Sequence, residues 1–201
     1  MLSEEQIQFY RDNGYIHVTN VFTAQELDEL EAEFDGVVAR RSKTDAKMDA
    51  TWEGDWKKDM PAMTIQHSHD VQQFSAAYGR VLYHPNMVGI LSGLIGPNVQ
   101  LHHTKLFQKP TETGGAFPLH QDYHYFPHEK HTMMAAVIHL TDATEEMGCI
   151  RVVPGSHKEG VLETYKSPTS KKYIHYLDPE KYPVESAKPV VAKRGDVVRT
   201  V

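Results

Sequence analysis

The spacing of hydrophobic residues divides the chain into a helical first half and a strand-rich second half. Two segments near the N-terminus open with the capping-box pattern, in which a hydroxyl and a side chain three residues later satisfy each other's backbone. These boxes are Ser3 with Gln6 and Thr23 with Glu26. Apolar residues recur at helical intervals through residues 27–37, and residues 15–18 look like a short strand after a turn at Gly14. The pattern predicts two capped helices separated by a strand.

The middle of the chain alternates between irregular and helical patterns. Residues 40–61 are charged and contain both tryptophans without a clear period, which predicts a long irregular connection. Residues 71–95 return to a helical period that is interrupted at 84–86 and stopped by Gly96. We therefore expect two further helical segments before the strands begin.

From residue 99 onward the hydrophobic period changes from helical to alternating. In residues 99–108 the side chains of His103, Lys105 and Phe107 share one face of a predicted strand. Further strands are predicted at 133–140, 149–153, 190–191 and 197–198. Helices first and strands afterwards indicate the α+β class.

Composition narrows the possible classes of partner. The net charge of −6 comes without a stripe of lysines or arginines, which argues against nucleic acid or an anionic membrane surface. No apolar stretch approaches the roughly 20 residues needed to span a bilayer. The single cysteine, Cys149, excludes a disulfide framework and is expected to be a small buried residue. We expect one domain, residues 1–201, in the cytoplasm.

The chain contains 13 histidines, and one of them stands in a spacing suited to metal binding. In His120-Gln121-Asp122, residues i and i+2 of an extended segment point the same way, so an imidazole and a carboxylate can meet on one ion. Two histidines and one carboxylate form the set used by non-haem iron(II) oxygenases. A chain of this composition contains about one such pair by chance, so the pair alone favours a polar strand end.

Longer motifs around the pair resemble the phytanoyl-CoA dioxygenase family. The string FPLHQDYHYFP is followed, after a predicted strand, by MGCIRVVPGSHKEG, which carries the family's Gly-Cys and Pro-Gly-Ser-His-Lys segment intact. The capped opening helix, the Asn-Gly-Tyr turn and the LFQKP segment are similar too, so the resemblance covers essentially the whole chain. It implies a double-stranded β-helix, a cupin-like jelly-roll barrel with the N-terminal helices packed on one side.

The resemblance also implies a site and its cofactors. His120 and Asp122 would be two of three ligands to iron(II), which also chelates the cosubstrate 2-oxoglutarate. Lys105 lies where family members often place a residue that contacts 2-oxoglutarate, and an ammonium suits a carboxylate. A solvated strand residue is an equally good interpretation of Lys105.

The other histidines are not expected to be ligands. His124 is expected outside the ligand set or at the surface, and His157, in the Pro-Gly-Ser-His turn, is expected to hydrogen-bond loop backbone. Barrel-lining or packing roles are expected for His102 and His103, and ordinary polar roles for His67 and His69.

The sequence departs from the family after Gly195-Asp196-Val197-Val198. Family members continue there with a strand that carries a second histidine ligand, and then with an arginine for 2-oxoglutarate. His175, Arg194 and Arg199 do not stand in those positions. The resemblance therefore implies that the last barrel strands are missing, and an exposed sheet edge would favour self-association.

Three functions follow, in order of preference. The first is an iron(II)/2-oxoglutarate-dependent dioxygenase that hydroxylates a C–H bond of a small-molecule or acyl substrate, releasing succinate and CO₂. In this family an aspartate at the position of Asp122 favours hydroxylation over halogenation. The second is a truncated, non-catalytic jelly-roll binding module, and the third is a cupin-type hydrolase or isomerase using zinc or manganese.

Overall fold

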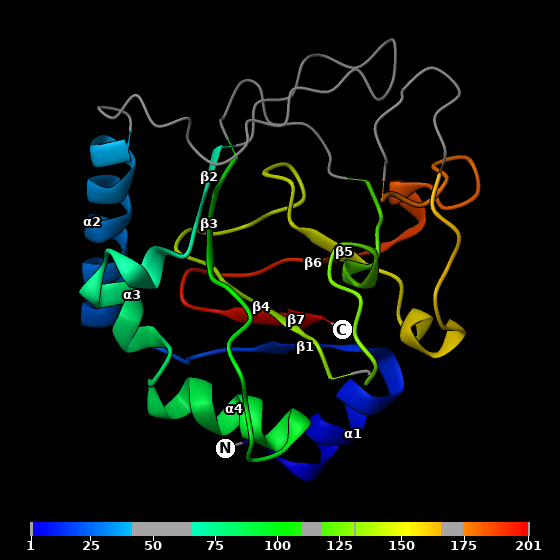
Figure 1. Cartoon of the computed structure of the whole chain (residues 1–201), viewed down its shortest axis with the longest axis horizontal. Coiled ribbons are helices and arrows are strands. Elements are labelled where there is room, and N and C mark those ends of the chain that lie inside the picture. Colours follow the sequence, from blue (N-terminus) through cyan, green and yellow to red (C-terminus); the bar gives the residue numbers. More distant parts are fainter. Residues whose placement is uncertain (1, 42–65, 110–117, 131, 166–174, 201) are drawn as a thin grey trace.

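The computed structural model describes residues 2–41, 66–109, 118–130, 132–165 and 175–200 (Figure 1). Its α-helices are α1 (Glu4–Asn13), α2 (Ala24–Arg41), α3 (Ala76–Val81) and α4 (Pro85–Ile95). Its strands are β1 (Tyr15–Val18), β2 (Gln66–His69), β3 (Lys105–Gln108), β4 (Ala135–Ile138), β5 (Ile150–Val152), β6 (Lys188–Val190) and β7 (Val197–Thr200). Short 3-10 turns are η1 (Val71–Gln73), η2 (Asp122–His124), η3 (Ser156–Glu159) and η4 (Val184–Ser186). No helix in these ranges combines the length and apolar character that a membrane span requires.

Both predicted capping boxes form at the starts of α1 and α2. The amide of Gln6 donates to Ser3 Oγ at 3.2 Å, and the Ser3 amide donates back to the Gln6 side chain at 2.9 Å. The Thr23 amide donates to Glu26 at 2.7 Å in the same way. Gly14 ends α1 at a φ of 75°, a left-handed conformation suited to glycine, and β1 follows at once. The predicted order of helix, strand and helix is confirmed.

The irregular connection predicted at 40–61 is tested only at its start. Arg40 and Arg41 belong to α2, so the helix runs two residues further than predicted. Residues 42–61 lie outside the described part of the chain.

The central sheet has the strand order β1-β7-β4, and both pairings are antiparallel. The C-terminal strand β7 therefore lies between a strand from the start of the chain and one from its middle. Two antiparallel pairs, β2 with β3 and β5 with β6, complete the described strands. Helices and sheets both contribute to the core, in agreement with the α+β prediction.

The strand predicted at 99–108 is shorter than the alternating pattern suggested. Only Lys105–Gln108 pair with β2, and the contact from the Asp70 amide to the Thr104 carbonyl at 2.8 Å marks the end of the ladder. Val99 and Leu101 remain exposed. The prediction for residues 99–104 was wrong because an alternating pattern does not by itself supply a partner strand.

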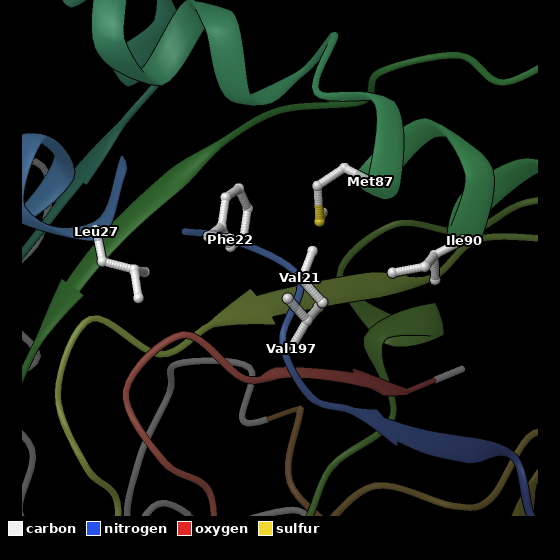
Figure 2. Close-up of a cluster of buried hydrophobic side chains, with 6 residues drawn as sticks. All are labelled: Val21, Phe22, Leu27, Met87, Ile90 and Val197. Carbon is white, nitrogen blue, oxygen red and sulfur yellow. The ribbon is translucent and has the colours of Figure 1, made fainter. Parts of the chain in front are cut away.

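Six buried side chains form a core between the central sheet and helices α2 and α4 (Figure 2). They are Val21, Phe22, Leu27, Met87, Ile90 and Val197. Val197, on β7, is fully buried, and its side chain lies on the face of the strand that packs against the helices. The apolar residues at helical spacing in α2 and α4 thus pack against the same strand, β7.

The opposite face of β7 packs against the pair β5–β6. Val198 is fully buried and packs with the buried residues Tyr15, Val190 and Ala192. Ile150 packs against this group. Figure 1 shows α1 and α4 on one side of β7 and β5–β6 on the other. β7 is therefore buried on both faces.

Arg199 is an exception in this apolar strand. Its side chain is fully buried, and within the described residues its Nε and Nη2 have no hydrogen-bond partner. Its Nη1 donates to the thioether of Met134, which is a weak acceptor. Burial lowers the pKa of Arg199 to about 10, and the phenol of Tyr10 opposes this shift. A buried charge with unsatisfied donors destabilises the fold.

We expect Arg199→Leu to stabilise the chain. Removing unsatisfied buried donors should raise the free energy of unfolding by about 1–3 kcal/mol, measured by urea unfolding. The folded pKa lies below the unfolded value, so the penalty for the charged form is fully present below about pH 10. The increase in the free energy of unfolding should therefore be equal at pH 6 and pH 8. If Arg199→Leu instead lowers the free energy of unfolding at both pH values, Arg199 makes a stabilising interaction in the native protein.

Candidate metal centre

His120 and Asp122 bring their side chains together at the end of an extended segment. His120 makes an antiparallel bridge with Tyr176, and Gln121 is extended, with φ −111° and ψ 132°. Asp122 then opens the turn η2. The distance from His120 Nε2 to Asp122 Oδ1 is 3.6 Å, and about a third of each side chain is exposed. The i, i+2 geometry expected from the sequence is present.

The carbonyl of Pro118 orients the imidazole of His120. Nδ1 lies 2.9 Å from the carbonyl oxygen of Pro118, which can only accept, so Nδ1 carries the proton. Nε2 of His120 then points toward the carboxylate of Asp122, 3.6 Å from Oδ1. Bonding of the second ring nitrogen to a backbone carbonyl is also the usual way in which metal-ligating histidines are oriented.

Asp122 is held in its ionised form, as a metal ligand must be. Hydrogen bonding to His120 lowers its pKa, and the charges of His120, His103 and Lys105 act in the same direction. Burial opposes these effects. The pair therefore has the donor set and the charge that a divalent cation requires.

Lys105 projects from β3 toward the same region. Desolvation lowers its pKa, and the negative charge of Asp122 raises it. Its Nζ lies 5.4 Å from the centre of the Phe107 ring. The structure thus places a cation close enough to feel the charge of Asp122, and the contact with 2-oxoglutarate remains a prediction.

The loop that carries the pair is anchored to a segment about forty residues further along the chain. The Gln121 side chain donates to the Gly160 carbonyl and accepts from the Leu162 amide, both at 2.8 Å. His124 Nε2 donates to the Leu162 carbonyl at 2.9 Å. His124 is therefore directed at backbone, as expected for a residue outside the ligand set.

Two tyrosines adjoin His120, and the sequence pattern gave no signal for either. The ring centre of Tyr125 lies 5.9 Å from that of His120, and the ring centre of Tyr176 lies 6.4 Å away. Burial raises the pKa of Tyr125 to about 12, the nearby charge of Asp122 adds to this rise, and interaction with Tyr176 partly offsets it. The phenol therefore stays neutral at physiological pH and does not compete as an anionic ligand.

The remaining histidines divide into packing and structural roles. His102 and His103 share a hydrogen bond between their Nδ1 atoms at 2.7 Å, and both rings pack on Phe126. The ring of His69 lies 5.8 Å from that of His103. The packing role predicted for His102 and His103 agrees with these contacts. The side chain of His67 lies outside the described part of the structure.

The predicted structural roles of His157 and Cys149 are confirmed. His157 Nε2 donates to the Arg11 carbonyl at 3.0 Å, which ties the Pro-Gly-Ser-His turn to the end of α1. A Cβ on Gly14 would come within 2.4 Å of the His157 ring, so a glycine is required there. Cys149 is buried.

The described residues do not show a third ligand. Within them, no group of three or more histidine, cysteine, aspartate or glutamate side chains is placed to hold a metal ion. Arg194 is directed elsewhere, because it pairs with Asp28 at 2.7 Å and with Glu31 at 2.9 Å on α2. His175 stacks on His124 with ring centres 6.3 Å apart.

Comparison with known proteins identifies the family. Residues 10–199 match the family described as phytanoyl-CoA dioxygenase (PhyH). The chain therefore belongs to the phytanoyl-CoA dioxygenase family. Peroxisomal phytanoyl-CoA dioxygenase of Rattus norvegicus is 28% identical over 214 residues, which cover 98% of this chain and 61% of the rat protein. A probable phytanoyl-CoA dioxygenase of Caenorhabditis elegans is 30% identical, over 84% of this chain and 56% of that protein.

The chain thus spans about 60% of the length of the rat enzyme.

Solved structures of other proteins have the same fold as this chain. The structure of EctD from S. alaskensis with 2-oxoglutarate and 5-hydroxyectoine has a TM-score of 0.78 at 20% identity, over 99% of this chain and 67% of that one. The non-haem alpha-ketoglutarate-dependent carbocyclase SnoK has a TM-score of 0.76 at 23% identity, over 99% and 74%. These likenesses show that the chain shares the fold of iron- and 2-oxoglutarate-dependent oxygenases.

The electrostatic coupling between Asp122 and Lys105 can be measured directly. Because the charge of Asp122 raises the pKa of Lys105, Asp122→Asn should lower that pKa further. Titration of the Lys105 side chain by carbon-detected NMR would follow the change. Asp142→Asn is the matched control, since Asp142 pairs with Lys193. An unchanged Lys105 pKa in Asp122→Asn would place the two groups too far apart to share a ligand site.

Proposed function

We propose that this chain carries the core of an iron(II)/2-oxoglutarate-dependent dioxygenase that hydroxylates a C–H bond of a small-molecule or acyl substrate. The observation that carries the proposal is the pairing of His120 Nε2 with an ionised Asp122, while Nδ1 of the same ring is bonded to the Pro118 carbonyl. This pairing occurs in a chain of the phytanoyl-CoA dioxygenase family. The donor set fits iron(II).

Bound iron(II) and 2-oxoglutarate supply the activation of O₂, with succinate and CO₂ as co-products. The residues of the chain bind and orient. His120 and Asp122 would hold the metal, and the Pro118 carbonyl orients the imidazole. Lys105 provides a positive charge that suits a carboxylate of 2-oxoglutarate. The protein thus sets geometry and charge, and the cofactors carry the chemistry.

The finer details of the architecture belong to this proposal. We infer a single domain, residues 1–201, with the double-stranded β-helix, or cupin-like jelly roll, as its frame. Its order β1-β7-β4 and the packing of β5–β6 against β7 support this arrangement. We also propose a cytoplasmic location. Self-association through a sheet edge has some support, since β4 pairs only with β7 among the described strands and exposes Val137.

A non-catalytic binding module is the second candidate. It is favoured by the finding that His120 and Asp122 have no further protein ligand placed beside them within the described residues. Such a module would retain the jelly-roll frame and bind a small molecule without turnover. Formation of succinate that depends on iron(II) and on a substrate would exclude it.

An anaerobic titration with iron(II) followed by 2-oxoglutarate tests the proposal. A visible charge-transfer band should form in the native chain, and His120→Ala should abolish it because one ligand is lost. His124→Gln, on the same loop, should keep the band, since His124 is directed at the Leu162 carbonyl. A folded native chain that gives no band would refute the proposed site.

The role of Lys105 has its own test in the same titration. Lys105→Met should weaken the apparent affinity for 2-oxoglutarate by roughly 10-fold, because one charge-assisted contact is lost. Iron(II) binding alone should change little. Equal 2-oxoglutarate affinity in Lys105→Met and the native chain would leave Lys105 as a solvated strand residue.

A further inference from the structure

A second group of titratable side chains lies at one end of the central sheet, outside the candidate metal centre. His17 is the third residue of β1, Asp196 directly precedes β7, and His139 directly follows β4. β7 lies between β1 and β4 and pairs antiparallel with both (Figure 1). The three residues therefore stand at the same end of three neighbouring strands.

The backbone of His139 closes the β4–β7 ladder at this end. Its amide donates to the Asp196 carbonyl at 3.0 Å, and its carbonyl accepts from the Gly195 amide at 2.7 Å. The buried side chain of Asp196 joins β1 to the same turn, because its Oδ2 lies 2.7 Å from His17 Nε2 and accepts from the Lys193 amide at 2.8 Å. The two backbone bonds of His139 thus hold the point at which the chain enters β7.

The imidazole of His139 is buried without a matching acceptor. Within the described residues, its Nε2 has no hydrogen-bond partner. Burial lowers the pKa of His139, the charge of Asp196 opposes this shift, and the charge of His17 adds to it. The folded sheet therefore favours the neutral imidazole, whereas an exposed histidine takes up a proton near the ordinary pKa of about 6.5.

The other charged groups at this end of the sheet are paired with one another. The pairs are Lys193 with Asp142, and Arg194 with Asp28 and Glu31 of α2. None of these five groups is among the charges that shift the pKa of His139. Within the described residues, burial, Asp196 and His17 are thus the influences on the protonation of His139.

We propose that His139 makes the closure of the β4–β7 ladder pH-sensitive, so that uptake of a proton by its imidazole opens the backbone bonds with Gly195 and Asp196. A protonated ring would bring a charge and a further N–H donor to a buried place, where Nε2 meets no acceptor among the described residues. Opening exposes the ring to water, which can solvate the charged form. The inference does not depend on the metal centre or on the proposed function.

The direction of the pH dependence follows from the lowered pKa. Above about pH 6.5, His139 is neutral in both the closed and the open form, so the closed form keeps its full stability. At lower pH the open form binds the proton more readily, because its pKa is the higher of the two. The closure is therefore lost progressively as the pH falls from about 6.5 toward the pKa of the closed form.

Amide hydrogen exchange of Gly195, measured by NMR above and below about pH 6.5 and expressed as a protection factor, tests the proposal at the bond concerned. In the native chain this amide should lose protection several-fold at the lower pH, and titration of the ring should give His139 a pKa below its ordinary value. His139→Phe and His139→Gln remove the titrating group, so in both variants the protection should be the same at the two pH values. If His139→Phe does not fold, His139→Gln decides the question.

His124→Gln is the matched control, since His124 Nε2 donates to the Leu162 carbonyl, and it should keep the native loss of protection at Gly195. Equal protection of the native Gly195 amide at both pH values would overturn the proposal. A loss in His139→Gln as large as that in the native chain would also overturn it, and so would a His139 pKa at or above about 6.5.

Discussion

The burial of β7 on both of its faces is the constraint on which the rest of the structure depends. Val197 packs against the helical side and Val198 against β5–β6, and both are fully buried. Because neighbouring residues of a strand point to opposite faces, one short strand joins two separate cores. Its neighbours β1 and β4 come from the start and the middle of the chain, so β7 also joins distant parts of the sequence.

The candidate metal centre is held by a different kind of support. His120, Gln121 and Asp122 lie outside the named strands, and backbone contacts to residues 160–162 and 176–177 fix their course. The Gln121 side chain makes one donor and one acceptor hydrogen bond to the backbone of residues 160–162, in place of the backbone pairing found between two strands. Such a loop can place two ligands side by side, which two alternating residues of a strand would also do.

Charge completes the arrangement at this centre. The charges of His103 and Lys105 favour the ionised form of Asp122, whereas Arg194 pairs with the carboxylates of Asp28 and Glu31 on α2. The anionic side chain of Asp122, a candidate ligand, therefore lies near the ammonium of Lys105, which suits a carboxylate cosubstrate beside a bound cation. Arg199 is not among the charges that shift the pKa of Asp122.

The sequence alone determined the local features whose causes lie within a few residues. The capping boxes at Ser3 and Thr23, the turn at Gly14 and the His-x-Asp spacing depend on neighbouring atoms, and each forms as predicted. Linked motifs also pointed to the family, which the match over residues 10–199 bears out. The extent of β3 could not be predicted, because strand length is set by the partner that pairs with it.

Only the tertiary structure decided how the site is built around its ligands. The Pro118 carbonyl that orients the His120 ring lies two residues away, yet its role depends on the course of the loop. Tyr176 reaches His120 through a bridge between segments far apart in sequence. Pairing between segments that are far apart leaves no periodic pattern in the sequence, because it depends on packing and hydrogen bonds made by other residues. For that physical reason the sequence points to the candidate pair His120 and Asp122, and the fold supplies the orientation of their side chains.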